Sequence, residues 1–224
     1  MVNERIKPWK SLNWPNRISI LRLLMVGPFF VLVMNQNQPR WEAARYVALA
    51  IFVAMALSDF LDGMLARRLN LRTRLGAILD PLADKVLISC SVVLLSLSHS
   101  AVPGAQLPDW VVVVIVGKDL WVIMGFLVIY LVTDRFRIRP TAAGKACTVA
   151  QLVMVMLVML SPDLNRLSEG LGGKLANVAV WTAVAISVLA VISYTRLGLG
   201  FVAEGAKPLD EGLQKNNQGS HGPH

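Results

Sequence analysis

The sequence predicts an all-α membrane protein with six transmembrane helices and an N-terminal amphipathic surface helix. Hydrophobic residues fill 55% of the 224 positions and charged residues 16%, whereas a soluble domain carries about 25% charged residues. The mean hydropathy is +0.56. The apolar residues gather in segments of about 20 residues, the length that crosses a bilayer as a helix. One compact membrane domain fits this chain length.

Six apolar segments are candidates for spanning helices. They are residues 18–34, 45–65, 76–98, 110–133, 146–161 and 175–197, of which the fifth is the shortest. Residues 1–15 mix tryptophans with basic residues, a composition typical of a helix lying on the membrane surface. We therefore divide the chain into a surface segment (1–15), a membrane domain (16–203) and a disordered polar tail (204–224).

The distribution of lysine and arginine predicts the orientation in the membrane. With the N-terminus inside, 15 of the 22 basic residues fall on the cytoplasmic side, 4 on the other side, and three within apolar segments. Basic residues are enriched in cytoplasmic loops, so both termini are expected in the cytoplasm. The net charge of +8 then reflects basic loops beside anionic lipid, and we expect no nucleic-acid partner.

Four aspartates lie inside apolar segments, where an unpaired carboxylate costs several kcal/mol. Asp59 and Asp62 are three residues apart and Asp80 and Asp84 are four apart, so each pair shares one helix face. The short basic connection between the two helices makes them antiparallel neighbours. Both acidic faces can therefore meet near the cytoplasmic end.

Carboxylates that face one another repel unless they are protonated or bound to a cation. A set of oxygen ligands without histidine or cysteine favours Mg²⁺, Mn²⁺ or Ca²⁺ over zinc. Four carboxylates are enough for two metal ions, and such a pair can clamp a diphosphate.

Small residues accompany the carboxylates. Gly63, Ala66 and Gly76 leave room for a substrate to approach the backbone, or else allow two helices to pack closely. Arg67 can neutralise a phosphate or mark the cytoplasmic boundary of the helix.

A longer motif contains all of these residues. Asp59-Phe-Leu-Asp62-Gly63-Met-Leu-Ala66-Arg67, followed by Gly76-Ala-Ile-Leu-Asp80-Pro-Leu-Ala-Asp84, reads D-x-x-D-G-x-x-A-R-x8-G-x3-D-x3-D. This string resembles the signature of the CDP-alcohol phosphotransferases at every fixed position. The likeness covers about residues 10–200.

The resemblance implies a function for each motif position. The four aspartates would bind two divalent ions, Mg²⁺ or Mn²⁺, and Asp84 would also be the general base. The residues lining the site for the CDP part of the donor would be Asp62, Gly63, Ala66, Arg67 and Gly76. The resemblance further implies a homodimer in a bacterial-type inner (plasma) membrane, with the active site open to the cytoplasm.

Flanking motifs bear on the acceptor alcohol. The stretches Pro15-Asn16-Arg17-Ile-Ser-Ile-Leu-Arg22, Gly117-Lys118-Asp119 and Gly144-Lys145-Ala-Cys-Thr148 resemble the phosphatidylglycerophosphate synthases. That branch transfers a phosphatidyl group from CDP-diacylglycerol to glycerol 3-phosphate and releases CMP. The CMP-forming cardiolipin synthases, which use phosphatidylglycerol, are also similar, and inositol phosphate and serine remain alternative acceptors.

A phosphorylated acceptor requires cationic partners. The candidates are Lys118, Arg135, Lys145 and Arg196. Two of them have a simpler interpretation, because Lys118 can pair with Asp119 in the same helix and Arg135 can serve as a positive-inside anchor.

A cation transporter is the alternative from another functional class. Its acidic residues would be spread over several helices near the bilayer midplane, often in repeated halves. Here all four aspartates belong to one two-helix unit and no repeat is visible, which favours the enzyme. His99, in a predicted outer loop, and the cysteines Cys90 and Cys147 are expected to take no part in the chemistry.

Overall fold

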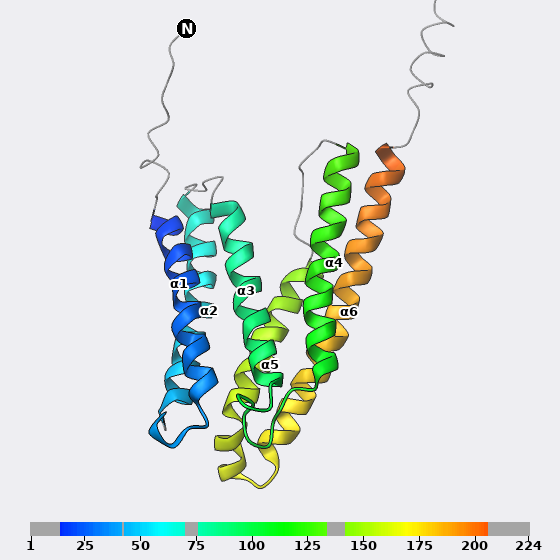
Figure 1. Cartoon of the computed structure of the whole chain (residues 1–224). Helices are drawn as coiled ribbons and strands as arrows, with labels where there is room; N and C mark the ends of the chain where they lie inside the picture. The colour runs from blue at the N-terminus through cyan, green and yellow to red at the C-terminus, as the bar shows by residue number, and fades with distance from the viewer. Residues whose placement is uncertain (1–13, 42, 70–75, 134–141, 206–224) are drawn as a thin grey trace, which may run out of the picture.

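The computed structural model describes residues 14–41, 43–69, 76–133 and 142–205, and the side chains of residues 20–41, 43–58, 85–125 and 143–199. These parts contain six α-helices, one short 3-10 helix and no strand, so the predicted all-α class is confirmed (Figure 1). The elements are α1 (Trp14–Asn35), η2 (Pro39–Trp41), α2 (Ala44–Leu69), α3 (Gly76–Ser96), α4 (Asp109–Thr133), α5 (Ala142–Leu167) and α6 (Leu171–Gly205).

Each predicted segment overlaps one of the α-helices. The largest difference is α6, which was expected over 175–197 and runs for 35 residues. The next largest is α5, which was expected over 146–161 and runs for 26 residues with Pro162 inside it. A proline removes one backbone hydrogen bond, and here the helix continues past it for another turn. The predicted surface segment (1–15) and tail (204–224) lie, except for two residues of each, in parts of the chain that the structure does not describe.

The α-helices run alternately up and down (Figure 1). We call the end at which α1, α3 and α5 begin and α2, α4 and α6 end the upper end, and the opposite one the lower end. Helix α1 packs against α2 and α3, and α6 packs against α4 and α5. Helices α2 and α3 run antiparallel, as expected, but among the described residues each packs mainly on α1 and not on the other, so the prediction that they are close neighbours is not confirmed. Contacts of α3 with α4 and α5, and of α2 with α5, join these two groups.

Apolar side chains fill the space between the helices. Phe29 of α1 and Phe52 of α2 lie with their ring centroids 5.9 Å apart, and both are fully buried. Leu94 of α3, Ile115 of α4 and Met154 of α5 are buried in the same core. In lipid, close packing rather than transfer out of water stabilises such a core.

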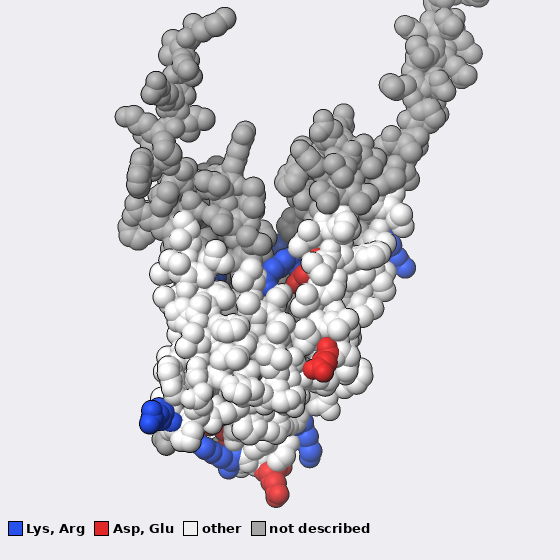
Figure 2. Space-filling view, viewed as in Figure 1, with Lys and Arg blue, Asp and Glu red and all other residues white. Residues whose placement is uncertain are grey.

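The outer surface is also apolar. Leu24, Val113 and Val178 are 65%, 71% and 64% exposed, and in the face shown in Figure 2 charged residues gather mainly near the two ends. Soluble monomers rarely expose such large apolar areas. Within the described residues, two stretches are long and apolar enough to cross a membrane, 143–167 and 171–199. These features indicate membrane association, and six spans remain a prediction.

Polar contacts fix the loops at the lower end. The Asn37 side-chain amide donates to the carbonyl oxygens of His99 (3.1 Å) and Ala101 (3.0 Å), which ties the α1–α2 connection to the α3–α4 loop. Arg45 of α2 forms a 3.0 Å ion pair with Asp163 of α5. The lower end is thus closed by direct contacts between distant segments.

Candidate functional site

The four motif aspartates are carried by helical backbone. Asp59 and Asp62 belong to α2, and Asp80 and Asp84 belong to α3, so the expected spacing of three and four residues along a helix is present. At a rise of 1.5 Å per residue they lie roughly 6–15 Å from the upper ends of their helices. Their side chains lie beyond the described ones. The backbone therefore carries both pairs at the same end of the molecule.

The predicted donor residues occupy the same helix ends. Gly63, Ala66 and Arg67 lie in the last turns of α2, and Gly76 is the first residue of α3. The structure describes their backbone but not their side-chain contacts. Of the predicted acceptor residues, Arg135 falls in the undescribed stretch between α4 and α5.

A buried aspartate joins two lysines between α3 and α4. Asp119 accepts a 2.6 Å hydrogen bond at Oδ1 from the Lys118 ammonium, and the Lys85 ammonium donates to the same oxygen. The Asp119 and Lys118 side chains are each 8% exposed and that of Lys85 is 35% exposed. In Figure 2 the surface is hollowed at the upper end between the two helix groups, and basic and acidic side chains lie at the bottom of the hollow.

This arrangement extends the sequence-based interpretation of Lys118. The predicted pairing of Lys118 with Asp119 is present, but the carboxylate is shared with Lys85 on another helix. Sequence reasoning gave Lys85 no function. The signal was available, because a lysine in an apolar segment needs a partner and Asp119 is the aspartate nearest the middle of the following segment.

The other two predicted acceptor residues lie elsewhere on the helices. Lys145, near the beginning of α5, and Arg196, in α6, are both exposed. No contact among the described side chains joins either of them to Lys118. The structure thus places three candidate cations on three helices without bringing them together.

The remaining polar residues near Lys145 hold α5 against α6. Ser187 lies 3.3 Å from the Cys147 sulfur and accepts a 3.2 Å hydrogen bond from Gln151. Both Gln151 and Ser187 are buried. This face of α5 is therefore structural, and Lys145 lies on the exposed side.

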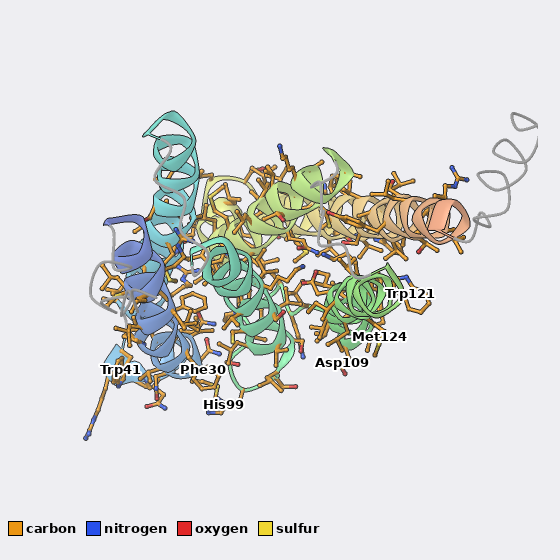
Figure 3. The ribbon with its side chains drawn as sticks, turned by 90° about the horizontal axis from the view of Figure 1, so that it is seen from above. Phe30, Trp41, His99, Asp109, Trp121 and Met124 are labelled. Carbon is orange, nitrogen blue, oxygen red and sulfur yellow. The ribbon has the colours of Figure 1, made fainter. Side chains whose placement is uncertain are left out.

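An apolar groove of about 290 Å³ runs between α4 and α6. It is lined by Val113, Val114, Gly117, Lys118, Trp121, Ser187, Val188 and Val191. The Trp121 indole donates a 3.1 Å hydrogen bond to Thr195, and Figure 3 shows Trp121 and Met124 on the outer side of α4. The nearly apolar lining offers few hydrogen-bond partners to a polar ligand such as a nucleotide.

Metal-binding side chains are scarce in the described part of the chain. There, no three or more histidine, cysteine or acidic side chains gather where they could hold a metal ion. His99 lies at the periphery (Figure 3), and Cys90 and Cys147 are free thiols. The four motif aspartates, with side chains outside this set, remain the predicted ligands.

This chain is similar to known proteins over most of its length. The family model described as CDP-alcohol phosphatidyltransferase matches residues 12–189. A protein of Mycobacterium tuberculosis (strain ATCC 25618 / H37Rv), named as a probable phosphatidylglycerophosphate synthase, is 34% identical over 198 residues, covering 88% of this chain and 83% of the relative.

Two further relatives carry the name CDP-diacylglycerol–glycerol-3-phosphate 3-phosphatidyltransferase. The protein of Aquifex aeolicus (strain VF5) is 31% identical over 192 residues, covering 85% of this chain and 98% of its own length. That of Bacillus subtilis (strain 168) is 28% identical over 191 residues, covering 81% and 93%. The similarity thus extends over nearly the whole of each protein.

Proposed function

Since this chain belongs to the CDP-alcohol phosphatidyltransferase family, we propose that it transfers the phosphatidyl group of CDP-diacylglycerol to glycerol 3-phosphate and releases CMP. The observation that carries this proposal is the similarity, over more than 80% of this chain, to relatives that are named for this reaction. The reaction makes the chain a transferase of phospholipid biosynthesis.

We further propose that two divalent ions, Mg²⁺ or Mn²⁺, bind to Asp59, Asp62, Asp80 and Asp84. The donor chemistry fits, because these are oxygen ligands only, and hard cations prefer oxygen. The backbone also fits, because α2 and α3 carry both pairs at the upper end. When bound, the ions supply positive charge that stabilises the diphosphate in the transition state.

Asp84 is proposed to act as the general base. Its carboxylate takes the proton of the acceptor hydroxyl while the acceptor oxygen attacks the phosphorus on the lipid side of the diphosphate. The bond between that phosphorus and the bridging oxygen breaks, and CMP leaves with the electron pair. Arg67 neutralises charge on the donor, and Gly63, Ala66 and Gly76 leave space for it.

The acceptor phosphate needs positive charge close to the hydroxyl that reacts. We assign this function to Lys118, Arg135, Lys145 and Arg196. Lys145 has the strongest support of the described residues. It is exposed near the upper end of α5, and it forms no ion pair with another described side chain.

The proposed membrane arrangement has six spanning helices, cytoplasmic termini and a cytoplasmic active site. The alternating helix directions support this arrangement, as does the excess of basic residues, 15 against 4, in the segments assigned to the upper side. A homodimer is proposed from the family resemblance.

The alternative acceptor is phosphatidylglycerol, which would give cardiolipin. The Gly117-Lys118-Asp119 motif favours it, because a basic residue followed by aspartate is similar to the corresponding motif of CMP-forming cardiolipin synthases.

One experiment distinguishes between the two acceptors, glycerol 3-phosphate and phosphatidylglycerol. Purified protein in detergent is given CDP-diacylglycerol and Mg²⁺ with either glycerol 3-phosphate or phosphatidylglycerol, and CMP release is measured. Release with glycerol 3-phosphate alone is expected. Release with phosphatidylglycerol alone would contradict the proposed acceptor and favour the alternative.

A further inference from the structure

Among the described side chains, the cluster formed by Lys85, Lys118 and Asp119 has an unbalanced charge. Two ammonium groups and one carboxylate sum to +1, and the Lys118 and Asp119 side chains are almost inaccessible. A charge at membrane depth is costly unless it meets a partner or water. The cluster therefore has the electrostatic character of a site for an anion.

The two ammonium groups are held close together. Both donate to Oδ1 of Asp119, so they lie no farther apart than two hydrogen bonds laid end to end, about 6 Å. An ammonium has three donors, and among the described residues each of these two makes one hydrogen bond. The remaining donors are available to an oxygen-rich ligand.

Lys85 is the member that a ligand can reach. Its side chain is 35% exposed, against 8% for Lys118. It also directly follows Asp84, the proposed general base, in α3. An anion bound by Lys85 would thus lie beside the residues proposed to carry out the reaction.

We propose that Lys85, held beside Lys118 by Asp119, binds the phosphate of the acceptor. This inference rests on the proposed function, in which that acceptor is glycerol 3-phosphate. The preferred ligand is a phosphate monoester, which carries more charge and more free oxygens than the diester of a phospholipid. Lys85 is thereby a specificity-determining residue that favours a phosphorylated alcohol over a neutral one.

The substitution that tests this proposal is Lys85→Met. It removes one cation and leaves Asp119 paired with Lys118, so no buried charge loses its only partner. The ligand-free protein is therefore expected to unfold at the same or a higher temperature than the wild type. A purely structural link between α3 and α4 predicts the opposite, namely a lower unfolding temperature.

Kinetics of the full-length protein in detergent with Mg²⁺ give the second readout. Lys85→Met is expected to raise the KM for glycerol 3-phosphate at least about tenfold and to leave the KM for CDP-diacylglycerol within about twofold. Lys85→Arg, which keeps the charge, is expected to restore most of the acceptor affinity. The matched control is Lys174→Met, an exposed lysine at the lower end of α6, which should change neither constant.

Binding without turnover separates this inference from the proposed reaction. Glycerol 3-phosphate alone should raise the unfolding temperature of the wild type and not that of Lys85→Met, whereas added phosphatidylglycerol should produce no Lys85-dependent shift. If that pattern holds but the wild type releases no CMP, the binding site stands and the proposed reaction fails.

Normal CMP release with an unchanged acceptor KM in Lys85→Met overturns the site alone. A rise in the donor KM equal to that of the acceptor also overturns it, as does a Lys85-dependent response to phosphatidylglycerol or no wild-type response to glycerol 3-phosphate.

Discussion

Gly172 of α6 lies against the backbone of Ser161 of α5 at the lower end. A Cβ atom added there would come 1.9 Å from the carbonyl oxygen of Ser161 and 2.7 Å from its carbonyl carbon. These are backbone atoms, so no rotation of a side chain relieves the clash. The two helices would have to separate by about 1 Å before the contact became tolerable.

Gly172→Ala is therefore expected to destabilise the protein strongly. Overpacking of a closely packed site costs about 1–3 kcal/mol, and a backbone clash belongs at the upper end of that range. For a chain of this size, 3 kcal/mol corresponds to a fall of roughly 6–12 °C in Tm. The better helix propensity of alanine offsets at most about 1 kcal/mol.

The neighbouring glycine provides the control. A Cβ atom at Gly173 would have Gly104 oxygen as its nearest contact at 3.9 Å, an ordinary separation, so Gly173→Ala should change stability by no more than about 1 kcal/mol. Both variants are measured by thermal unfolding in detergent, followed by tryptophan fluorescence. Equal Tm values for the two variants would refute the close approach of α5 and α6. CMP release at low temperature should remain in both, because these glycines lie at the lower end.

Four further outcomes are expected from the proposed chemistry. Chelation of divalent ions should stop CMP release, and Mg²⁺ or Mn²⁺ should restore it; turnover in excess chelator would exclude the metal role. Asp84→Asn should lower turnover by at least about 100-fold and retain CDP-diacylglycerol binding, so normal turnover in this variant argues against a general base there. Asp59→Asn should shift the metal dependence of activity to higher concentration and raise the donor KM with it; an unchanged metal titration would count against this ligand. Lys145→Ala should raise the KM for glycerol 3-phosphate about tenfold, and a rise confined to the donor KM would contradict its assignment.

Much of the fold could be predicted from hydropathy alone. Each of the six apolar segments overlaps one helix, because a run of apolar residues long enough to cross a bilayer must satisfy its own backbone hydrogen bonds. The extent of α5 could not be predicted, since Pro162 and the polar residues that follow it are usual signs of a helix end. Contacts of α2 with this extension, such as Arg45 with Asp163, exist only in three dimensions.

The candidate site, like the fold, could be predicted only in part from the sequence. The spacing of the motif aspartates made them candidates, because residues three or four apart share one face of a helix. The sharing of Asp119 was missed, since Lys85 lies 34 residues away and Lys118 alone provided an adequate partner. Lys118 and Asp119 were expected to pair because they are adjacent in the sequence, and the folded structure adds Lys85 as a third charged group.

Depth in the molecule determines how such a charge cluster should be interpreted. At the lower end, Asp163 also meets two cations, Arg45 at 3.0 Å and Arg166 at 3.6 Å, so its charge sum is the same as that of the cluster around Asp119. Arg166, however, is 75% exposed, and water or lipid headgroups can solvate its charge at little cost. The more exposed lysine of the cluster around Asp119, Lys85, is 35% exposed, about half as much as Arg166, and Lys118 is 8% exposed. Water can therefore solvate the excess charge less fully at the cluster between α3 and α4, which is why we propose an anion site there and a structural contact at the lower end.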